Sequence, residues 1–429
     1  MDRVYVNPSI VYGEVNAPPS KSYTHRAYAV SLLVDGKNFI YSPLRSRDTQ
    51  ATLRACQQFG AEVYEEGSSK IIVGGGLKLP ENIVDAENSG TTLRIFTAIS
   101  ALPPSGYVVL TGDESLRRRP MKPLLDALKL LGVDCWSTRG DGCAPIIVKS
   151  GGIKGGETVV RGDVSSQFVS ALLIASTKAE RETKIRVEGN IVSKKYIDAT
   201  IEVLKRYGYH VRREGYTLFE VEPSQHGHPT HFKIPGDFSS ASFLFAGAYL
   251  TGGRVEIENL SLDLPQADSV IIDILRDFDN KVTIGSSKII VESRGISSGD
   301  REYDLVDSPD LVPVIAVMAS KSPGETIIKG VRHARFKESD RITSTALELR
   351  KLNIDVEILE DGMKIRGREE IEGGVELDSH NDHRLSMAFS ILAASTRKGC
   401  IVNGLRWAEI SYPNYLEDLK KLGVSFREV

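Results

Sequence analysis

A pattern of about seventy residues recurs along the chain: an amphipathic helix, one small or polar residue, and then alternating apolar and polar positions. In the first copy the helix ends at Gly60, and the alternation that follows closes with residues 70–74. Apolar residues three and four positions apart predict the helix, and the alternation predicts a pair of strands. Six copies share this break, at the anchors Gly60, Gly132, Gly208, Asp279, Asn353 and Gly423.

The residue types at the six anchors are typical of a helix end. Gly, Asn and Asp tolerate the left-handed backbone conformation that often terminates a helix. Successive anchors are 72, 76, 71, 74 and 70 residues apart. Each copy therefore predicts a helix followed by a strand, a turn and a strand, with further helices and strands between the copies. Because no copy can bury a core alone, we expect the six to pack together.

Two proline-containing segments divide the six copies into two sets of three. Pro18-Pro19 and Ile234-Pro235-Gly236 are about 216 residues apart, which is three repeats. Proline stiffens the chain and breaks regular structure on either side. We expect the chain to cross between two domains at these points, one formed by residues 20–235 and the other by residues 1–19 with 236–429.

Composition adds limits to this picture. The 429 residues are 41% apolar and 26% charged, with a net charge of −3, which is typical of a globular protein and provides no far-reaching basic field for nucleic acid or membrane. Four cysteines without a CxxC pair predict reduced thiols in a cytosolic protein. We find no signal-peptide pattern, and the longest apolar stretch, residues 312–319, is too short to cross a bilayer, so we expect a soluble protein.

Several predicted helix starts are rich in hydroxyl groups or glycine, and some of them carry Lys or Arg nearby. They are residues 20–26, residues 88–94 and residues 163–168. A helix N-terminus has unpaired N–H donors and a partial positive charge, so it can bind phosphate or carboxylate. Taken singly, each of these starts is more commonly a plain N-cap, and the basic runs 117–119 and 337–341 could be solvated surface charge.

Nine motifs in order change this interpretation, because together they resemble 5-enolpyruvylshikimate-3-phosphate synthases over nearly the full length. The motifs are residues 19–26, 88–94, 110–120, 165–167, 193–197, 236–241, 308–310, 335–341 and 382–384. The resemblance implies an α/β (α+β) fold, a two-domain inside-out α/β barrel built from six βαβαββ repeats, three per domain. It also implies an active site in the cleft between the domains, which substrate draws together.

The resemblance implies two anionic substrates, shikimate 3-phosphate and phosphoenolpyruvate, and a contact set for each. The shikimate 3-phosphate contacts are Lys21, Ser22, Arg26, Ser165, Ser166, Gln167, Ser193, Tyr196, Asp310, His333 and Lys337. The phosphoenolpyruvate contacts are Lys21, Gly90, Arg119, Gln167, Arg341 and Arg384. These residue types suit the task, because the planar arginine fork grips carboxylate or phosphate in two bonds and Gly90 permits close backbone approach.

The reaction implied by the resemblance needs a proton for the methylene carbon of phosphoenolpyruvate and a group that takes the proton of the 5-hydroxyl. Glu338 is expected to be the proton donor, and Asp310 the base or shuttle, with Lys21 able to assist. We expect no metal and no organic cofactor, and we expect the protein to act as a monomer.

Two positions depart from the family pattern. Ile410 stands where many members have a lysine, so one expected phosphoenolpyruvate contact is missing or supplied elsewhere. His333 stands where an asparagine is common, although an imidazole can still donate a hydrogen bond. Both changes bear on affinity rather than on the class of reaction.

The sequence also leaves other functions to consider. A UDP-N-acetylglucosamine enolpyruvyl transferase shares the fold and chemistry, but that family has a Lys-Asn pair where this chain has Lys21-Ser22, and a cysteine in the loop that here runs from Gly112 to Arg119 without one. A non-catalytic repeat scaffold would explain the repeats but not the carboxylates among the basic motifs. The histidines of residues 226–231 could bind a metal, although their Gly and Pro neighbours favour a polar linker loop.

Overall fold

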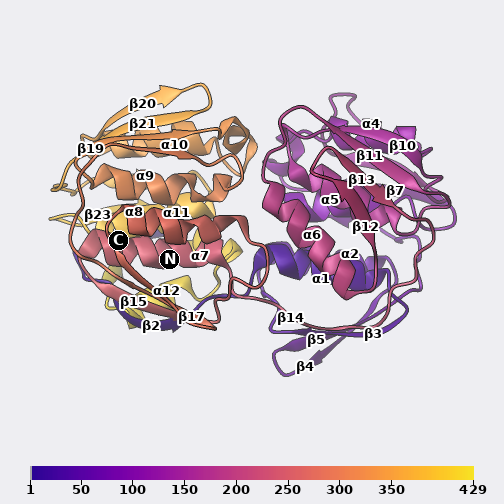
Figure 1. The fold of residues 1–429 in the computed structure, drawn as a ribbon, viewed down its shortest axis with the longest axis horizontal. Helices are drawn as coiled ribbons and strands as arrows, with labels where there is room; N and C mark the ends of the chain where they lie inside the picture. The colour runs from indigo at the N-terminus through magenta and orange to yellow at the C-terminus, as the bar shows by residue number, and fades with distance from the viewer. Residues whose placement is uncertain (1) are drawn as a thin grey trace. The chain divides into compact units, whose positions relative to one another are not determined.

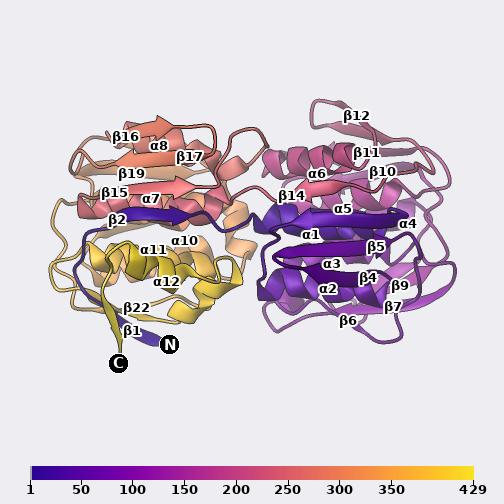
Figure 2. The same cartoon turned by 90° about the horizontal axis from the view of Figure 1, so that it is seen from below.

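Six four-stranded sheets form the frame of the protein, in a computed structural model that describes residues 2–429 (Figures 1 and 2). In every sheet the first two strands are parallel, and in five of the six an antiparallel hairpin completes the sheet. Along the chain, each of the first five repeats gives a strand, a helix, a strand, a second helix and two hairpin strands, and the sixth gives one strand after its second helix. This is the βαβαββ order expected from the sequence, so the predicted fold class is confirmed.

The chain divides into two compact units, which we call the inserted unit (Pro19–Ile234) and the discontinuous unit (the N-terminal segment through Pro18 together with Pro235–Val429). These boundaries differ by one residue from the expected crossing points. Each unit holds three of the six sheets.

In the inserted unit the first helices of the repeats are α1 (Lys21–Leu32), α3 (Gly90–Ile99) and α5 (Ser166–Ser176), and the second helices are α2 (Arg47–Gln58), α4 (Lys122–Leu130) and α6 (Lys194–Arg206). A short 3-10 helix, η1, spans Leu116–Arg118. The sheets, in strand order, are β14 (His231–Lys233), β3 (Gly36–Tyr41), β5 (Ser69–Gly74) and β4 (Glu62–Glu66); β6 (Val84–Asp85), β7 (Gly106–Thr111), β9 (Ile146–Ser150) and β8 (Cys135–Ser137); and β10 (Gly156–Arg161), β11 (Thr183–Glu188), β13 (Leu218–Val221) and β12 (Val211–Glu214).

In the discontinuous unit the first helices are α7 (Phe238–Thr251), α9 (Val312–Ser320) and α11 (His383–Ala394), and the second helices are α8 (Ile271–Asp277), α10 (Arg341–Lys351) and α12 (Tyr415–Lys421). Its 3-10 helices are η2 (Ala267–Val270), η3 (Pro309–Leu311), η4 (Arg332–Phe336) and η5 (Leu405–Ile410). The sheets, in strand order, are β2 (Tyr12–Asn16), β15 (Arg254–Glu258), β17 (Lys288–Glu292) and β16 (Lys281–Ile284); β18 (Arg301–Asp304), β19 (Gly324–Lys329), β21 (Gly362–Gly367) and β20 (Asp355–Leu359); and β22 (Glu376–Asp378), β23 (Cys400–Asn403), β1 (Arg3–Val6) and β24 (Phe426–Glu428).

An exchange of first strands explains why one unit is discontinuous in sequence. Strand β2 leads into α1 of the inserted unit but pairs in parallel with β15 of the discontinuous unit. Strand β14 leads into α7 of the discontinuous unit but pairs in parallel with β3 of the inserted unit. The crossings therefore fall between the first strand and first helix of two repeats, where the proline segments lie. The sixth sheet is completed by the N-terminal strand β1, which pairs with both β23 and β24.

The six anchor residues all adopt the left-handed backbone conformation that their residue types predict. Their φ angles are positive, between 59° at Asp279 and Asn353 and 101° at Gly60. Each follows one of the second helices of the repeats and precedes the hairpin strands. The repeat read from the sequence is therefore confirmed at its turning points.

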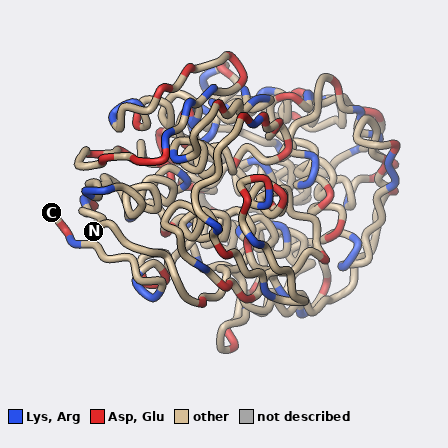
Figure 3. The backbone as a smooth tube through the Cα atoms, turned by 60° about the vertical axis from the view of Figure 1, so that its left-hand side comes forward, with Lys and Arg blue, Asp and Glu red and all other residues tan. Residues whose placement is uncertain are grey.

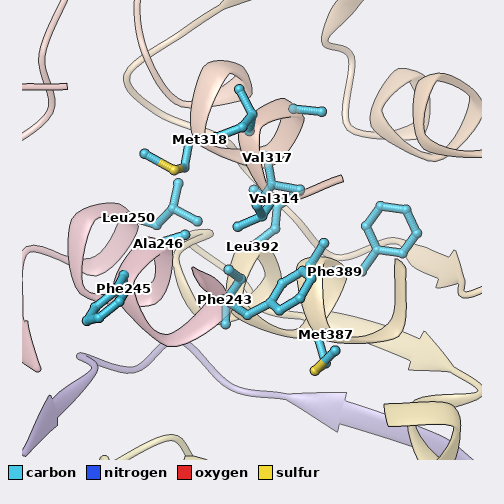
Figure 4. Close-up of a cluster of buried hydrophobic side chains, with 14 of the residues drawn as sticks. Phe243, Phe245, Ala246, Leu250, Val314, Val317, Met318, Met387, Phe389 and Leu392 are labelled. Carbon is cyan, nitrogen blue, oxygen red and sulfur yellow. The ribbon is translucent and has the colours of Figure 1, made fainter. Parts of the chain in front are cut away.

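The first helices of the repeats form the core of each unit. Helices α7, α9 and α11 pack against one another in the discontinuous unit, and residues such as Phe243, Val317 and Phe389 fill the space between them (Figure 4). All residues of α9 and α11 are buried. A helix that is apolar on all sides requires such enclosure. The polar residues that begin these helices are therefore held at the ends of a rigid apolar body.

The distribution of charge and the histidines of residues 226–231 bear on two further expectations from the sequence. Basic and acidic positions are interspersed along the chain (Figure 3). Within residues 2–429 no helix is long and apolar enough to cross a membrane. Residues 226–230 form a loop, as expected. His231, however, belongs to β14, where its ring stacks on Phe39 at 4.4 Å and its Nδ1 lies 2.6 Å from the Tyr41 hydroxyl.

Replacing Lys321 by methionine should destabilise the discontinuous unit. The Lys321 ammonium donates to the carbonyls of Leu250 and Ser395, both at 2.8 Å, and so satisfies the ends of α7 and α11. Methionine keeps the apolar stem but leaves two carbonyls without a donor, so we expect a loss of about 2–4 kcal/mol in the free energy of unfolding. Urea denaturation at neutral pH measures this loss. The control is Lys281→Met, since Lys281 is 58% exposed; equal losses in both variants would contradict the assigned role.

Candidate active site

Arg341 is the centre of a buried cluster of acidic and basic side chains in the discontinuous unit. It opens α10, after the N-cap residue Asp340, whose carboxylate accepts a hydrogen bond from the backbone N–H of Thr343 at 3.1 Å. Its side chain is 1% exposed. The guanidinium donates to three carboxylates, to Asp310 at 2.5 Å, to Glu338 at 2.8 Å and to Asp382 at 2.8 Å.

Asp310 connects Arg341 to two further cations. Its second carboxylate oxygen accepts from Arg384 Nη2 at 3.3 Å, and the Lys337 ammonium lies 3.8 Å from the first. Arg384 lies in the first turn of α11, two residues after the N-cap Asp382, and is 2% exposed. Within residues 2–429, the Nε and Nη1 atoms of Arg384 are buried and have no hydrogen-bond partner. The protein itself thus leaves these two donors unsatisfied.

The surrounding charges fix the protonation of this cluster. Burial favours the neutral form of Asp310, but Arg384, Lys337 and Arg341 outweigh it and hold the pKa of Asp310 well below its usual range. Burial disfavours the charged form of Arg341, but Asp382, Glu338 and Asp310 raise its pKa well above the ordinary value. Asp310 is therefore an ionised hydrogen-bond acceptor and a weak base at neutral pH.

His333 lies in η4 beside this cluster and is uncharged. Burial, assisted by the positive charge of Lys337, lowers the pKa of His333 to about 3. Its Nε2 is buried, and none of the residues 2–429 gives it a hydrogen-bond partner. A neutral imidazole can offer one donor or one acceptor to a ligand, as expected from the sequence for a residue that replaces asparagine.

A second cluster lies at the starts of α3 and α5 in the inserted unit. Ser89 and Ser165 cap these helices through their hydroxyl groups. Arg94 Nη1 donates to the Gln167 side-chain oxygen at 2.6 Å, and Gln167 Nε2 donates to the Thr91 hydroxyl at 3.1 Å. These bonds join the two helix N-termini, whose N–H groups favour an anion.

Gly90 begins α3 and is enclosed by this cluster. A Cβ atom at Gly90 would lie 3.2 Å from Arg119 Nη1 and 3.6 Å from Arg94 Nη1. Arg119 follows η1 and donates through Nη2 to Asn88 and Ser115, both at 3.2 Å. The backbone at Gly90 is thus open toward two guanidinium groups.

The residues expected at the start of α1 have different environments. Lys21 pairs with Asp48 at 3.0 Å, and Ser20, the N-cap by position, makes no side-chain cap. Arg26 is 2% exposed, and its three nitrogens donate to Thr200, to the Ser22 carbonyl, and to Ser170 and the Tyr196 carbonyl. Burial lowers the pKa of Arg26 to about 10. Arg26 therefore ties α1 to α5 and α6, and its contact with a substrate stays a prediction.

The remaining expected contacts lie at helix starts of the inserted unit. Ser166 opens α5 and is buried. Ser193 precedes α6 with a left-handed backbone (φ 57°), and Tyr196 is in the first turn of that helix. Ile410, which departs from the family pattern, ends η5 and is 4% exposed, so its side chain belongs to the apolar interior.

One group of residues has the donor types of a metal site. Glu338, Asp382 and His383 each have a ligand atom within 4.8 Å of those of the other two. Arg341 already bonds to both carboxylates, at 2.8 Å each, so its guanidinium supplies the positive charge that a metal ion would bring. The arrangement is better explained as a charge cluster around arginine than as a metal centre.

Sequence reasoning left out of the expected contacts three residues that the structure joins to these clusters. Arg94 was noted as the basic residue of its helix start but was given no contact, and Asp382 was quoted only within a motif, although a charged residue at a helix start is a signal for both. Asp48, the partner of Lys21, is within a different helix and has no signal in the sequence. The structure assigns Arg94 to the anion cluster and the two aspartates to counter-charges.

Gly90→Ala should weaken binding of an anion at the start of α3 more than it affects folding. The added methyl group would approach Arg119 at 3.2 Å and reduce the space above the helix N-terminus. We expect the KM for an anionic substrate to rise by roughly tenfold, which corresponds to ~1.4 kcal/mol. Steady-state kinetics measure this rise. Gly76→Ala is the control, because a Cβ there meets nothing within 4 Å; equal KM values in both variants would contradict the prediction.

Comparisons with known proteins agree on one family. Residues 6–419 match the model of the family described as EPSP synthase (3-phosphoshikimate 1-carboxyvinyltransferase). The chain is 46% identical over 425 residues to the 3-phosphoshikimate 1-carboxyvinyltransferase of Korarchaeum cryptofilum and 43% identical over 425 residues to that of Methanothermobacter thermautotrophicus, with 99% of each chain covered in both cases. A solved structure of EPSP synthase from Acinetobacter baumannii is similar with a TM-score of 0.84 and 26% identity, and all of both chains is covered.

Proposed function

We propose how two clusters of side chains carry out one reaction, from the premise that this chain belongs to the EPSP synthase family. The chain is a 3-phosphoshikimate 1-carboxyvinyltransferase of the shikimate pathway, which transfers the enolpyruvyl group of phosphoenolpyruvate to the 5-hydroxyl of shikimate 3-phosphate and releases phosphate. The roles of individual residues below are our proposal.

The observation that carries the proposal is the cluster around Arg341. An ionised Asp310 and the carboxylate of Glu338 both bond to this guanidinium, while Arg384 beside them has two buried donors to offer. A transfer between two anions needs this combination, because negative charge must be held while protons are added and removed. A scaffold that only binds anions has no use for two carboxylates among the cations.

We assign the enolpyruvyl donor to cationic side chains and to the backbone at the start of α3. Arginine pairs grip the carboxylate and phosphate of phosphoenolpyruvate, and the Gly90 backbone approaches it closely. The proposed contacts are Lys21, Gly90, Arg119, Gln167, Arg341 and Arg384. Because Ile410 is buried and apolar, we assign no anion contact to η5.

We assign shikimate 3-phosphate to hydroxyl groups at helix starts, together with groups that can orient its ring. The neutral imidazole of His333 can bond to a hydroxyl or phosphate oxygen, and Lys337 adds a positive charge. The proposed contacts are Lys21, Ser22, Arg26, Ser165, Ser166, Gln167, Ser193, Tyr196, Asp310, His333 and Lys337.

The proton inventory then has four transfers. Asp310 accepts the proton of the 5-hydroxyl as that oxygen bonds to C2 of phosphoenolpyruvate, and Glu338 gives a proton to C3. When the C2–O bond to phosphate breaks, Glu338 takes a proton back from C3, which restores the methylene group of the product, and the proton held by Asp310 passes to the departing phosphate, so that both carboxyl groups return to their starting state. The phosphoenolpyruvate anion competes for Arg341 with Glu338, and this competition allows Glu338 to hold its proton until transfer.

The test is the release of phosphate from phosphoenolpyruvate by the purified protein. We expect release only when shikimate 3-phosphate is present. Turnover with UDP-N-acetylglucosamine in its place would overturn the proposal in favour of the related transferase. Binding of both anions without turnover would favour a non-catalytic scaffold.

We propose that the active unit is one chain in a reducing cytosol. One chain supplies both clusters, and the structure has four cysteine thiols, three of them buried. Sedimentation of the active protein at assay concentration tests the monomer; a dimer that loses activity on dilution would contradict it.

A further inference from the structure

Asp268 is a buried carboxyl group that no step above uses. It lies in η2 and is 1% exposed. Its Oδ2 accepts a hydrogen bond from the Ser239 hydroxyl in the first turn of α7. Within residues 2–429, its Oδ1 is buried and has no hydrogen-bond partner. A half-satisfied buried carboxyl group is costly to fold, so it calls for an explanation.

Hydrogen bonds fix η2 relative to the Arg341 cluster. The Gln266 side chain, one residue before η2, donates to the Gly236 carbonyl at 2.8 Å and accepts from the Phe238 N–H at 3.2 Å. The Ser308 hydroxyl, two residues before Asp310, donates to the Ala267 carbonyl at 2.9 Å. The position of Asp268 is therefore set by the same segments that begin α7 and carry Asp310.

Three charged groups act on Asp268 from neighbouring elements. Asp310 from η3 and Asp237 before α7 oppose its ionisation, and Arg384 from α11 favours it. Burial is the largest influence, and together with Asp310 it raises the pKa of Asp268 to about 7. Near neutral pH this carboxyl group thus exchanges its proton while Asp310 stays ionised.

We propose that Asp268 is a positioning residue for the reaction: as a neutral acid it leaves the charge of Arg384 to Asp310 and the enolpyruvyl donor, and as an anion it withdraws that charge from the substrate. Two observations carry this inference. The buried Oδ1 of Asp268 has no hydrogen-bond partner, and neither have two buried nitrogens of Arg384. The inference rests on the proposed role of Arg384 as a contact of phosphoenolpyruvate.

The kinetic test compares wild type with Asp268→Asn from about pH 5.5 to about pH 9, on both sides of the expected transition. With shikimate 3-phosphate saturating, the wild-type KM for phosphoenolpyruvate should rise above pH 7 relative to that of the variant, to a ratio of at least about threefold. Titration of the substrate is common to both proteins and cancels in the ratio. The kcat of the variant should stay within about twofold of wild type, because asparagine resembles the neutral acid in shape.

A second variant keeps the carboxyl group and moves its titration. The Ser239 hydroxyl favours the ionised form of Asp268. Ser239→Ala should therefore shift the rise in KM to higher pH, whereas Asp268→Asn should abolish that rise. The control is Asp273→Asn in α8, whose side chain is 76% exposed and which should keep the wild-type profile.

Stability gives a readout independent of activity. The pKa of Asp268 is raised in the folded state, so the unfolded chain loses this proton at lower pH than the folded one. Wild-type folding stability is then lost as pH rises from about 4 to about 7, and Asp268→Asn should not show this loss. The Tm of the variant minus the Tm of wild type should therefore be larger at pH 8 than at pH 4.

A KM ratio that does not change with pH, or a wild-type profile in Ser239→Ala, would overturn the inference, while turnover by wild type would still support the proposed function. Absence of wild-type turnover would instead overturn the proposed function, and the Tm comparison alone would then decide whether Asp268 titrates.

Discussion

Glu338→Gln should lower kcat by about 10²- to 10⁴-fold and change the KM for either substrate little. Glutamine has nearly the shape of glutamate, and its side-chain oxygen can still accept the hydrogen bond from Arg341, which is 2.8 Å in the structure. It cannot deliver a proton to the methylene carbon of phosphoenolpyruvate. Binding is therefore preserved and the chemical step is lost. Steady-state kinetics with both substrates measure the two effects separately.

Isotope exchange separates the role of Glu338 in proton transfer from a general loss of structure. During turnover in D₂O, wild type should place deuterium on the methylene carbon of product and recovered phosphoenolpyruvate, because Glu338 exchanges its proton with solvent. Glu338→Gln should not do so within the same time. The control is Glu360→Gln, a residue 82% exposed in the same unit. Undiminished exchange in Glu338→Gln would assign the proton donor to another group.

The repeat could be predicted because it depends on local backbone chemistry. The end of each second helix needs a residue that tolerates positive φ, so Gly60 and Asn353 could be recognised from residue type and spacing alone. The crossing of the chain at the two proline segments was predicted as well, but the pairing of β2 with β15 and of β14 with β3 was not, because strand pairing depends on contacts far apart in sequence. The same holds for β1, which completes the sixth sheet from the opposite end of the chain.

The candidate site shows the same division. The helix starts that hold Gly90 and Arg341 could be predicted because a helix start leaves its signature in consecutive positions, whereas their expected substrate contacts came from the resemblance to the family. The side chains that pair with the site residues were not predicted. Asp48 lies twenty-seven residues from Lys21 and Asp268 lies in a 3-10 helix, and nothing adjacent to either signals its role. For Arg26 the structure adds hydrogen bonds that join three helices, and its expected contact with the substrate stays a prediction.

Arg341→Met should destabilise the protein strongly, as well as stop turnover. Methionine has a similar length but no charge, so Asp310, Glu338 and Asp382 would lose the cation to which all three bond. Removing one partner of a buried ion pair typically costs ~3–5 kcal/mol, because the remaining charges stay buried without compensation. We expect a loss of this size in the free energy of unfolding at pH 7, measured by guanidinium denaturation.

The dependence of that loss on pH distinguishes charge from packing. Arg341 and its neighbours hold the pKa of Asp310 well below the unfolded value, so the stability from this pairing is present above that value and is lost as pH falls through the folded pKa. The cost of Arg341→Met should therefore shrink below about pH 4, where the carboxylates of the variant take up protons. Arg332→Met is the control, because Arg332 is 70% exposed in its pair with Glu360 and should cost less than ~1 kcal/mol at any pH. If Arg341→Met lowered the free energy of unfolding equally at pH 4 and pH 7, its effect would come from lost packing. Charge compensation by Arg341 would then no longer explain how two carboxyl groups are held beside an anionic substrate.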